Sequence, residues 1–149
     1  MTATNTSLAN YDAARSALQK ARTLLAQARS LPQVLKVRDL AEAAKTYARS
    51  AHLGREAQNY AGEIALAASI KAGEILARLE KKPGSRTDRP PASTAGGSEY
   101  AEVLKETKTA ETTAIRWQKL ADKTLVPDSL VAEYVASCRT SGEVTMAGL

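Results

Sequence analysis

The side chains whose types and spacing suit a chemical task are the basic, amide and hydroxyl residues of the stretch EYAEVLKETKTAETTAIRWQKLADK, from Glu99 to Lys123. Its pattern predicts two short helices, over Glu99–Glu106 and Ala110–Lys123, with a short break between them. In a helix-turn-helix, the first helix supports the second, which lies in the major groove of DNA with its polar face on bases and phosphates. The stretch is therefore a candidate DNA-reading element.

The two faces of this helix pair are predicted from the spacing of its residues. The apolar residues suited to the inner faces are Val103, Leu104, Ala114, Trp117 and Leu120. The polar residues predicted to face outward and contact DNA are Thr112, Thr113, Arg116, Gln118, Lys119 and Lys123. Arg116 or Gln118 suits a bidentate contact with a purine, whereas hydroxyl and lysine side chains suit phosphates. Trp117 is assigned to the core rather than to base stacking, because Ala114 and Leu120 lie three residues to either side of it.

The predicted turn departs from the usual pattern. A helix-turn-helix commonly has glycine in the turn, then an apolar residue and a Ser or Thr cap, and here those places hold Lys108, Thr109 and Ala110. Thr109 could cap the second helix one residue early, while Lys108 would have to adopt a positive φ that glycine accepts more easily. Lys108 also adds a basic side chain, and we include it among the predicted DNA contacts.

Catalytic motifs are missing from the sequence. It contains no glycine-rich phosphate loop, and a single histidine, His52, and a single cysteine, Cys138, cannot supply a zinc cluster or a disulfide. We therefore interpret the protein as non-enzymatic, with no catalytic residues, metal or cofactor.

The rest of the sequence predicts further helices, which would support the candidate DNA-reading element. Phe is absent and aromatic residues make up 4% of the chain, whereas Ala, Leu, Lys, Arg and Glu are frequent, which favours helix. Apolar residues at intervals of three and four predict helices over residues 8–29, 32–52 and 55–82, with Leu40 and Tyr47 among the inward residues of the second. Gly62 and Gly73 lie inside the third helix, where they would permit close contact with a neighbouring element. The predicted fold is all-α: an Ala-rich hairpin or bundle, or a coiled-coil dimer, joined to the small module.

We expect three regions along the chain. Residues 1–82 form the helical region, through which the protein would self-associate, and residues 83–98 form a flexible basic linker rich in Pro, Gly and Ser. In the linker, Arg86 and Arg89 are candidate phosphate contacts. Residues 99–149 contain the helix pair and a further helix that starts at Pro127 and stops at Gly142, after which the ending EVTMAGL is expected to fray.

Net charge and hydropathy limit the kinds of partner that the protein can have. The formal net charge is +5, and residues 81–123 hold 9 Lys and Arg against 6 Asp and Glu, which favours polyanionic partners. The N-terminus lacks the pattern of a signal peptide, and no apolar run approaches the length of a membrane span. We therefore expect a soluble, cytoplasmic protein with no membrane partner.

Most of the chain resembles a family of phage, prophage and mobile-element proteins. The residues that carry the resemblance are the helical stretch VRDLAEAAKTYARSAHLGREAQNYAGEIALAASIKAGEILARLEK, the polar stretch GSRTDRPPAST and the segment AEVLKETKTAETTAIRWQKLA. The resemblance implies a helix-turn-helix similar to that of ParB-like and KorB-like DNA-binding proteins. It also implies a regulatory or accessory role on double-stranded DNA.

A second interpretation stays open. The chain could be a helical protein-interaction module, such as a phage-encoded adapter or inhibitor of a host protein, that keeps the helix-turn-helix shape without binding DNA. An exposed basic face made by Arg116, Lys119 and Lys123 with Lys105 or Lys108 would favour DNA, whereas neutralisation of that face by Glu106 and Glu111 would favour a protein partner.

Overall fold

The computed structural model describes residues 3–79, 99–145 and 149, and over these residues the protein is all-helical, as predicted. The helices are α1 (Ala3–Gln27), α2 (Leu31–Ser50), α3 (Arg55–Arg78), α4 (Glu99–Glu106), α5 (Glu111–Ala121) and α6 (Asp128–Ser141). The predicted linker, residues 83–98, lies outside the described part of the chain, and Arg86 and Arg89 lie outside it as well.

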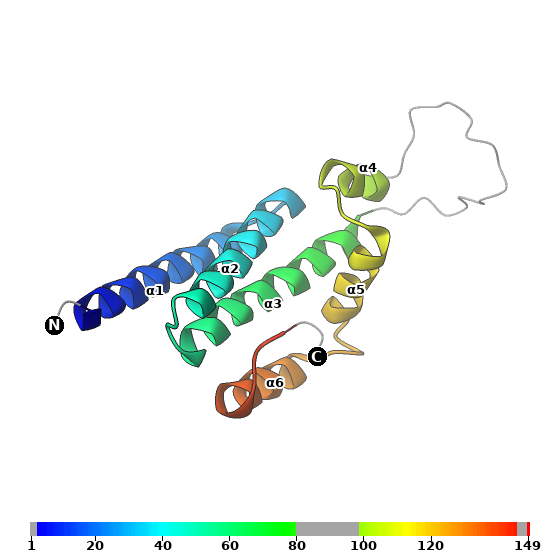
Figure 1. Ribbon diagram of the computed structural model, residues 1–149. Coiled ribbons are helices and arrows are strands. Elements are labelled where there is room, and N and C mark those ends of the chain that lie inside the picture. Colours follow the sequence, from blue (N-terminus) through cyan, green and yellow to red (C-terminus); the bar gives the residue numbers. More distant parts are fainter. Residues whose placement is uncertain (1–2, 80–98, 146–148) are drawn as a thin grey trace, which may run out of the picture.

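The first three helices run back and forth, and their connections follow the local chemistry of the sequence (Figure 1). Ser30 takes an extended backbone ahead of α2, and Pro32 lies in the first turn of that helix, where the missing N–H of proline costs nothing. α2 ends where the Leu53 N–H donates to the Ala48 carbonyl at 2.9 Å. Gly54 then takes a φ of 91°, which glycine adopts without strain because it has no Cβ.

The outer face of α2 corrects part of the predicted core. Leu40 and Tyr47 were expected to point inward, but they are 45% and 46% exposed. The helix instead buries the neighbouring stripe that contains Val34, Val37 and Ala41. The sequence of α2 is apolar on both sides of that stripe, and only the position of α3 decides which side is covered.

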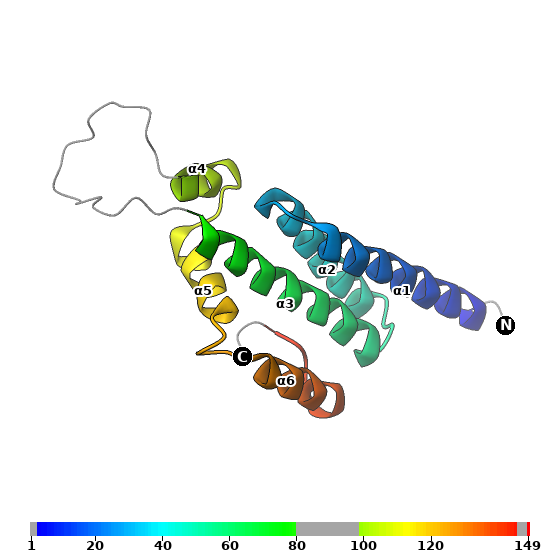
Figure 2. The same cartoon turned by 180° about the vertical axis from the view of Figure 1, so that it is seen from behind.

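α3 occupies the centre of the molecule, with α2 and α6 on different sides and α5 across its carboxyl end (Figures 1 and 2). Its most extensive contacts are with α2 and α5. A Cβ on Gly73 would lie 1.9 Å from the carbonyl oxygen of Trp117, and one on Gly62 would lie 2.8 Å from the carbonyl oxygen of Val144. These distances confirm that both glycines permit a close approach by another part of the chain.

The side chains of all five helices from α1 to α5 meet in one apolar core. That core joins Leu18 of α1, Val34 of α2 and Leu76 of α3 to Tyr100 of α4 and Trp117 of α5. A second cluster, of Leu66, Leu120, Cys138 and Val144, connects α3 and α5 to α6 and to the segment after it. The described residues from Glu99 onward therefore pack directly on the first three helices.

The segment Glu143–Thr145, which we call the C-terminal strap, corrects a second expectation. It was predicted to fray, yet Val144 is only 1% exposed and lies against Gly62 of α3. Residues 146–148 lie outside the described part of the chain. No partner for the strap was evident in the sequence, because its partners are polar side chains scattered over three different helices.

Candidate nucleic-acid interface

The turn between α4 and α5 is tight and is closed by backbone hydrogen bonds. The Thr109 N–H donates to the Leu104 carbonyl at 2.9 Å, and the Lys108 N–H donates to the Lys105 carbonyl at 3.3 Å, which is the pattern of a Schellman cap. Lys108 takes a φ of 53°, as the sequence required of the residue in the position of the usual glycine. The side chain of Lys108 is exposed at the outside of this turn.

The cap of α5 differs from the prediction. Its N-cap residue is Ala110, which has no side chain that could accept a hydrogen bond from the first turn. The Thr109 hydroxyl lies 2.8 Å from the Thr107 hydroxyl, which in turn donates to the Val103 carbonyl at 2.7 Å. Thr109 therefore stabilises the turn rather than capping α5.

The inner face of α5 is fixed against the rest of the protein. Trp117 is 2% exposed, and it lies with Ala114 in the main core, so the structure places it in the core as predicted. The guanidinium carbon of Arg38, on α2, lies 5.3 Å from the centroid of the Trp117 ring, within the range of a cation–π interaction. With Gly73 of α3 against the Trp117 backbone, α5 has little freedom to move relative to α3.

Two of the predicted DNA contacts, Thr113 and Gln118, are only partly exposed. The Gln118 side-chain amide donates to the Tyr100 hydroxyl at 3.0 Å, and this bond joins α5 to α4. Both Gln118 and Thr113 are half-buried. Gln118 was expected to point outward; the structure gives it a position between the two helices instead.

Three predicted contacts share the exposed side of α5. Thr112, Arg116 and Lys119 recur at intervals of four and three, so they project from successive turns in one direction, and all are exposed. Ile115 lies on the same side and is 42% exposed. Neither Arg116 nor Lys119 forms an ion pair with a residue in the described part of the chain.

Lys123 has a different environment from Arg116 and Lys119. Its ammonium donates a hydrogen bond to the Asp128 carboxylate and lies 3.9 Å from a carboxylate oxygen of Glu74. The hydrogen bond to Asp128 raises the pKa of Lys123; burial opposes this effect, and the charges of Asp128 and Glu74 reinforce it. Lys123 therefore forms ion pairs just after the end of α5, and these pairs connect it to α3 and α6.

The neighbouring acids leave the exposed basic side of α5 intact. Glu106 and Glu111 are both exposed, and neither comes within ion-pair distance of Arg116 or Lys119. Glu111 lies in the first turn of α5, where its charge interacts favourably with the helix dipole. Thr112, Arg116 and Lys119 of α5, with Lys108 of the turn, form what we call the α5 basic face.

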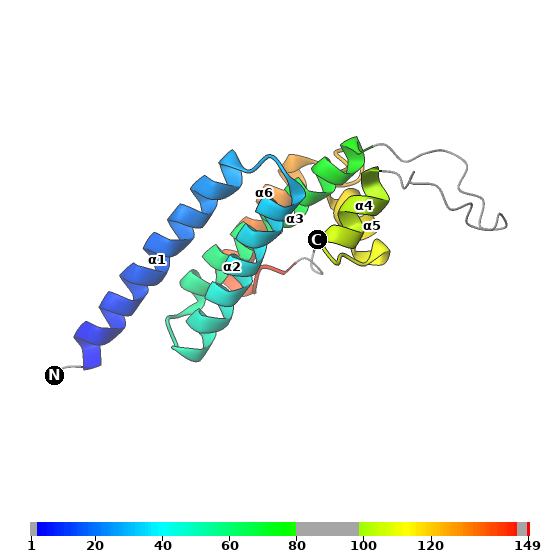
Figure 3. The ribbon, with the colours of Figure 1, turned by 90° about the horizontal axis from the view of Figure 1, so that it is seen from above.

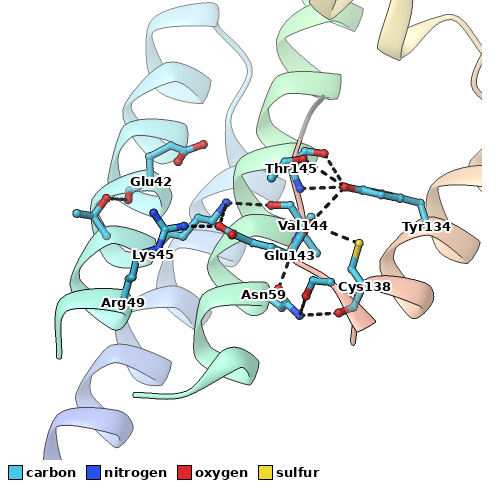
Figure 4. Close-up of polar contacts among 11 residues, drawn as sticks. Glu42, Lys45, Arg49, Asn59, Tyr134, Cys138, Glu143, Val144 and Thr145 are labelled. Carbon is cyan, nitrogen blue, oxygen red and sulfur yellow. Dashed lines mark hydrogen bonds and ion pairs between the residues drawn. The ribbon is translucent and has the colours of Figure 1, made fainter. Parts of the chain in front are cut away.

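The best-connected polar cluster of the described residues surrounds the C-terminal strap, and the sequence did not predict it (Figure 4). The buried Asn59 amide donates to the carbonyls of Cys138 and Gly142 at 3.0 and 3.3 Å, and its oxygen accepts from the Val144 N–H at 3.3 Å. Lys45 donates to the Val144 carbonyl at 3.0 Å. The one signal in the sequence was an amide inside an apolar helix, three residues before Gly62.

Two further side chains hold the ends of the strap. The Glu143 carboxylate pairs with Lys45 at 2.9 Å and also with Arg49, both on α2. The hydrogen bond from Lys45 lowers the pKa of Glu143; burial opposes this effect, and the charges of Lys45 and Arg49 reinforce it. The Tyr134 hydroxyl, on α6, donates to the Thr145 carbonyl at 3.0 Å. The strap thus joins α2, α3 and α6.

Comparison of the chain with family models, with curated proteins and with solved structures finds no match. The resemblance to phage and mobile-element proteins therefore stays a prediction. Within the part of the chain that the structure describes, no helix is both long and apolar enough to cross a membrane. The same residues contain no group of three or more His, Cys, Asp or Glu side chains that could hold a metal ion.

Proposed function

We propose that the protein is a non-enzymatic DNA-binding protein that contacts double-stranded DNA through the α5 basic face. The observation that carries the proposal is the division of α5 into two sides. Trp117 and Ala114 fix one side to α3, while Thr112, Arg116 and Lys119 stand exposed on the other. A rigidly held helix with an exposed basic side suits contact with a phosphate backbone.

The individual side chains suit different contacts. The Arg116 guanidinium is planar and can donate two parallel hydrogen bonds to a guanine in the major groove. Lys119, Lys108 and the Thr112 hydroxyl suit phosphate oxygens, which they would contact from both ends of the α5 basic face. Gln118 bonds to Tyr100 between the helices, and the exposed Lys123 already pairs with Asp128, so the contact set is smaller than the sequence predicted and phosphate contacts dominate it.

Glu111 restricts the direction of approach. Its carboxylate is exposed in the first turn of α5, where it would repel a phosphate that approached the helix N-terminus. Arg116 lies at the middle of α5 and Lys119 in its last turn. We therefore place the duplex mainly along the middle and carboxyl half of α5, with Lys108 and Thr112 contacting phosphates at its edge.

Fluorescence anisotropy with a labelled mixed-sequence duplex, at two salt concentrations, tests the proposal. The parent protein should bind more weakly at the higher salt, because each neutralised phosphate releases counterions. The variant Arg116→Ala/Lys119→Ala should lose most of this binding. If both side chains contact phosphates, the slope of log K against log salt should fall by about 1.8, at about 0.9 for each contact.

A matched variant separates the α5 basic face from general charge. Lys20→Ala/Lys36→Ala removes the same two charges from exposed positions on α1 and α2, and it should bind nearly as well as the parent. An equal loss in both variants would contradict a specific role for α5. A folded parent protein that does not bind the duplex at low salt would contradict the proposal as a whole.

The exposed outer face of α2 supports a second candidate function, a helical protein-interaction module. Leu40, Ala43 and Tyr47 recur at intervals of three and four on that face, and all three are exposed. Exposed apolar side chains in one stripe are typical of protein-binding helices. A folded parent protein that fails to bind DNA would favour this candidate, and the variant Leu40→Lys/Tyr47→Lys would then serve to locate the partner's binding site.

A further inference from the structure

A groove of about 650 Å³ lies between α1 and the amino-terminal part of α3, on the opposite end of α3 from α5. The wall formed by α1 includes Tyr11, Arg15 and Arg22, and the wall formed by α3 includes Glu56, Tyr60 and Glu63. The groove is open to solvent.

The half of α1 that borders this groove has little cover from the rest of the protein. In the view from above, α1 stands apart from α2 (Figure 3). Its buried residues begin at Leu18, and no side chain from Ala9 to Ala17 is buried. A helical segment of this length is only marginally stable in water by itself, so this half of α1 would gain stability from a further partner.

The two walls of the groove carry opposite charges that do not meet. Arg15 and Arg22 make the α1 wall basic, and Glu56 and Glu63 make the α3 wall acidic. Arg15, Arg22 and Glu56 form no ion pair with any residue that the structure describes, whereas Glu63 accepts hydrogen bonds from Arg139 of α6 at 3.1 and 3.3 Å. Arg139 also lines the groove, so an occupant that satisfied both walls would have to present acidic groups to α1 and a basic group to Glu56 of α3.

We propose that the occupant is a second copy of this chain, so that the protein forms a two-fold symmetric dimer. In such a dimer every contact occurs twice, and the same surface of each copy meets itself. The α1 helices would lie antiparallel between the two α3 helices, with Arg15 of each copy beside Glu56 of the other. The charge pattern of the groove is complementary to itself under this symmetry, and the half-buried Tyr11 and Tyr60 supply apolar contact area.

A charge exchange tests this arrangement. Sedimentation equilibrium of the full chain should give a dimer of twice 15.8 kDa. The variants Arg15→Glu and Glu56→Arg should each be monomeric, because each would place like charges opposite one another twice. An equimolar mixture of the two variants should regain the dimer, since both contacts of the mixed pair are again between opposite charges.

Matched measurements make each outcome decisive. Lys20→Glu makes the same charge change as Arg15→Glu on an exposed residue of α1 outside the groove, and this variant should stay dimeric. Circular dichroism should show that all variants keep the helix content of the parent. A monomeric parent at all concentrations, single variants that stay dimeric, or a mixture that stays monomeric would each overturn the proposal.

This inference goes beyond the proposed DNA-binding function and does not rest on it. The measurements contain no DNA, and neither Arg15 nor Glu56 belongs to the α5 basic face. Failure of the dimer would therefore leave the anisotropy experiment unaffected, and loss of DNA binding in the Arg116→Ala/Lys119→Ala variant would leave the dimer intact.

Discussion

Two residues other than glycine, His52 and Lys108, have a φ of 53° in the described part of the chain, and each ends a helix. In both places the N–H of the following residue closes a Schellman turn, from Leu53 to Ala48 and from Thr109 to Leu104. A left-handed backbone costs an L-residue with a side chain about 1–2 kcal/mol. Lys108 lies in the candidate interface, where the benefit of its positive charge would explain why a strained lysine stands in place of glycine. No such benefit is visible at His52.

Replacing His52 with glycine should therefore stabilise the protein. We expect His52→Gly to raise the free energy of unfolding by about 0.5–1 kcal/mol, since the greater freedom of glycine in the unfolded chain offsets part of the gain. Urea denaturation would measure the change. Ala43→Gly, at an exposed helical position of α2, should lower the free energy of unfolding by about 1 kcal/mol, and a decrease in both variants would contradict the assigned strain.

Gly73 should tolerate no side chain. Its Cβ would lie 1.9 Å from the Trp117 carbonyl oxygen and 2.4 Å from the carbonyl carbon, and both atoms belong to the backbone of α5. Gly73→Ala should therefore push α5 away from α3 and lower the free energy of unfolding by about 3 kcal/mol. In Gly142→Ala the new Cβ would meet only ordinary contacts at 3.9 Å, so this control should be nearly neutral in the same denaturation experiment.

At the scale of elements, the periodicity of apolar residues predicted where the helices lie in the sequence well, and it predicted less well which side of each helix is buried. The spacing of apolar residues predicted α2, α3 and α6 to within a few residues, because a helix needs only one apolar stripe to be recognised. It could not decide which side of an Ala-rich helix is covered, and Leu40 and Tyr47 were assigned to the wrong side for that reason. Small alanine side chains mark the covered and the exposed sides of such a helix almost equally.

In the candidate interface, too, the features set by neighbouring residues in the sequence were predicted, whereas the contacts between different helices were not. Trp117 was assigned correctly because its neighbours at intervals of three are apolar, and this is a local property. Gln118 was predicted to face outward, but it is half-buried and bonds to Tyr100 of α4. Lys123 does face outward, and the prediction missed only its ion pairs with Glu74 and Asp128 of other helices. Pairings between polar side chains of different helices leave no periodic trace in a sequence.

The C-terminal strap should make stability depend on pH through Glu143. The hydrogen bond from Lys45 holds the pKa of Glu143 below its usual value of about 4.3, so its contribution is fully present above that pH and is lost as the pH falls through the folded pKa. Because Glu143 is partly exposed, we expect Glu143→Gln to lower the free energy of unfolding by only about 0.5 kcal/mol at pH 7.

The difference between Glu143→Gln and the parent should shrink as the pH falls below the usual pKa of a glutamate and through the lowered pKa of Glu143, where the parent carboxylate takes up its proton. Urea denaturation across this range would measure it. Glu133→Gln serves as the control, since Glu133 is exposed on α6 and pairs with no described cation. A constant difference from pH 7 to pH 3 would mean that Glu143 acts through packing rather than through its charge.

At the scale of the whole molecule, the shared core has a consequence for unfolding. Trp117 of α5 lies in the same apolar cluster as Leu18 of α1 and Leu76 of α3, and the strap connects α2 and α3 to α6. A division of the chain into a helical region and a separate module would require few contacts between the two. The packing of α5 on α3 instead predicts that the described helices unfold together.

The single tryptophan makes this prediction measurable. Fluorescence of Trp117 reports the contact of α5 with α3, whereas circular dichroism reports mainly the long helices α1, α2 and α3. The two signals should give the same urea midpoint and the same slope, because a single cooperative transition moves both. In Gly73→Ala both midpoints should fall by the same amount, since a substitution at the α3–α5 contact then destabilises all the helices that unfold together. A parent protein whose fluorescence changes well before its helix signal would show that α5 is held on α3 less firmly than its burial requires, and would weaken the rigid support on which DNA contact through α5 depends.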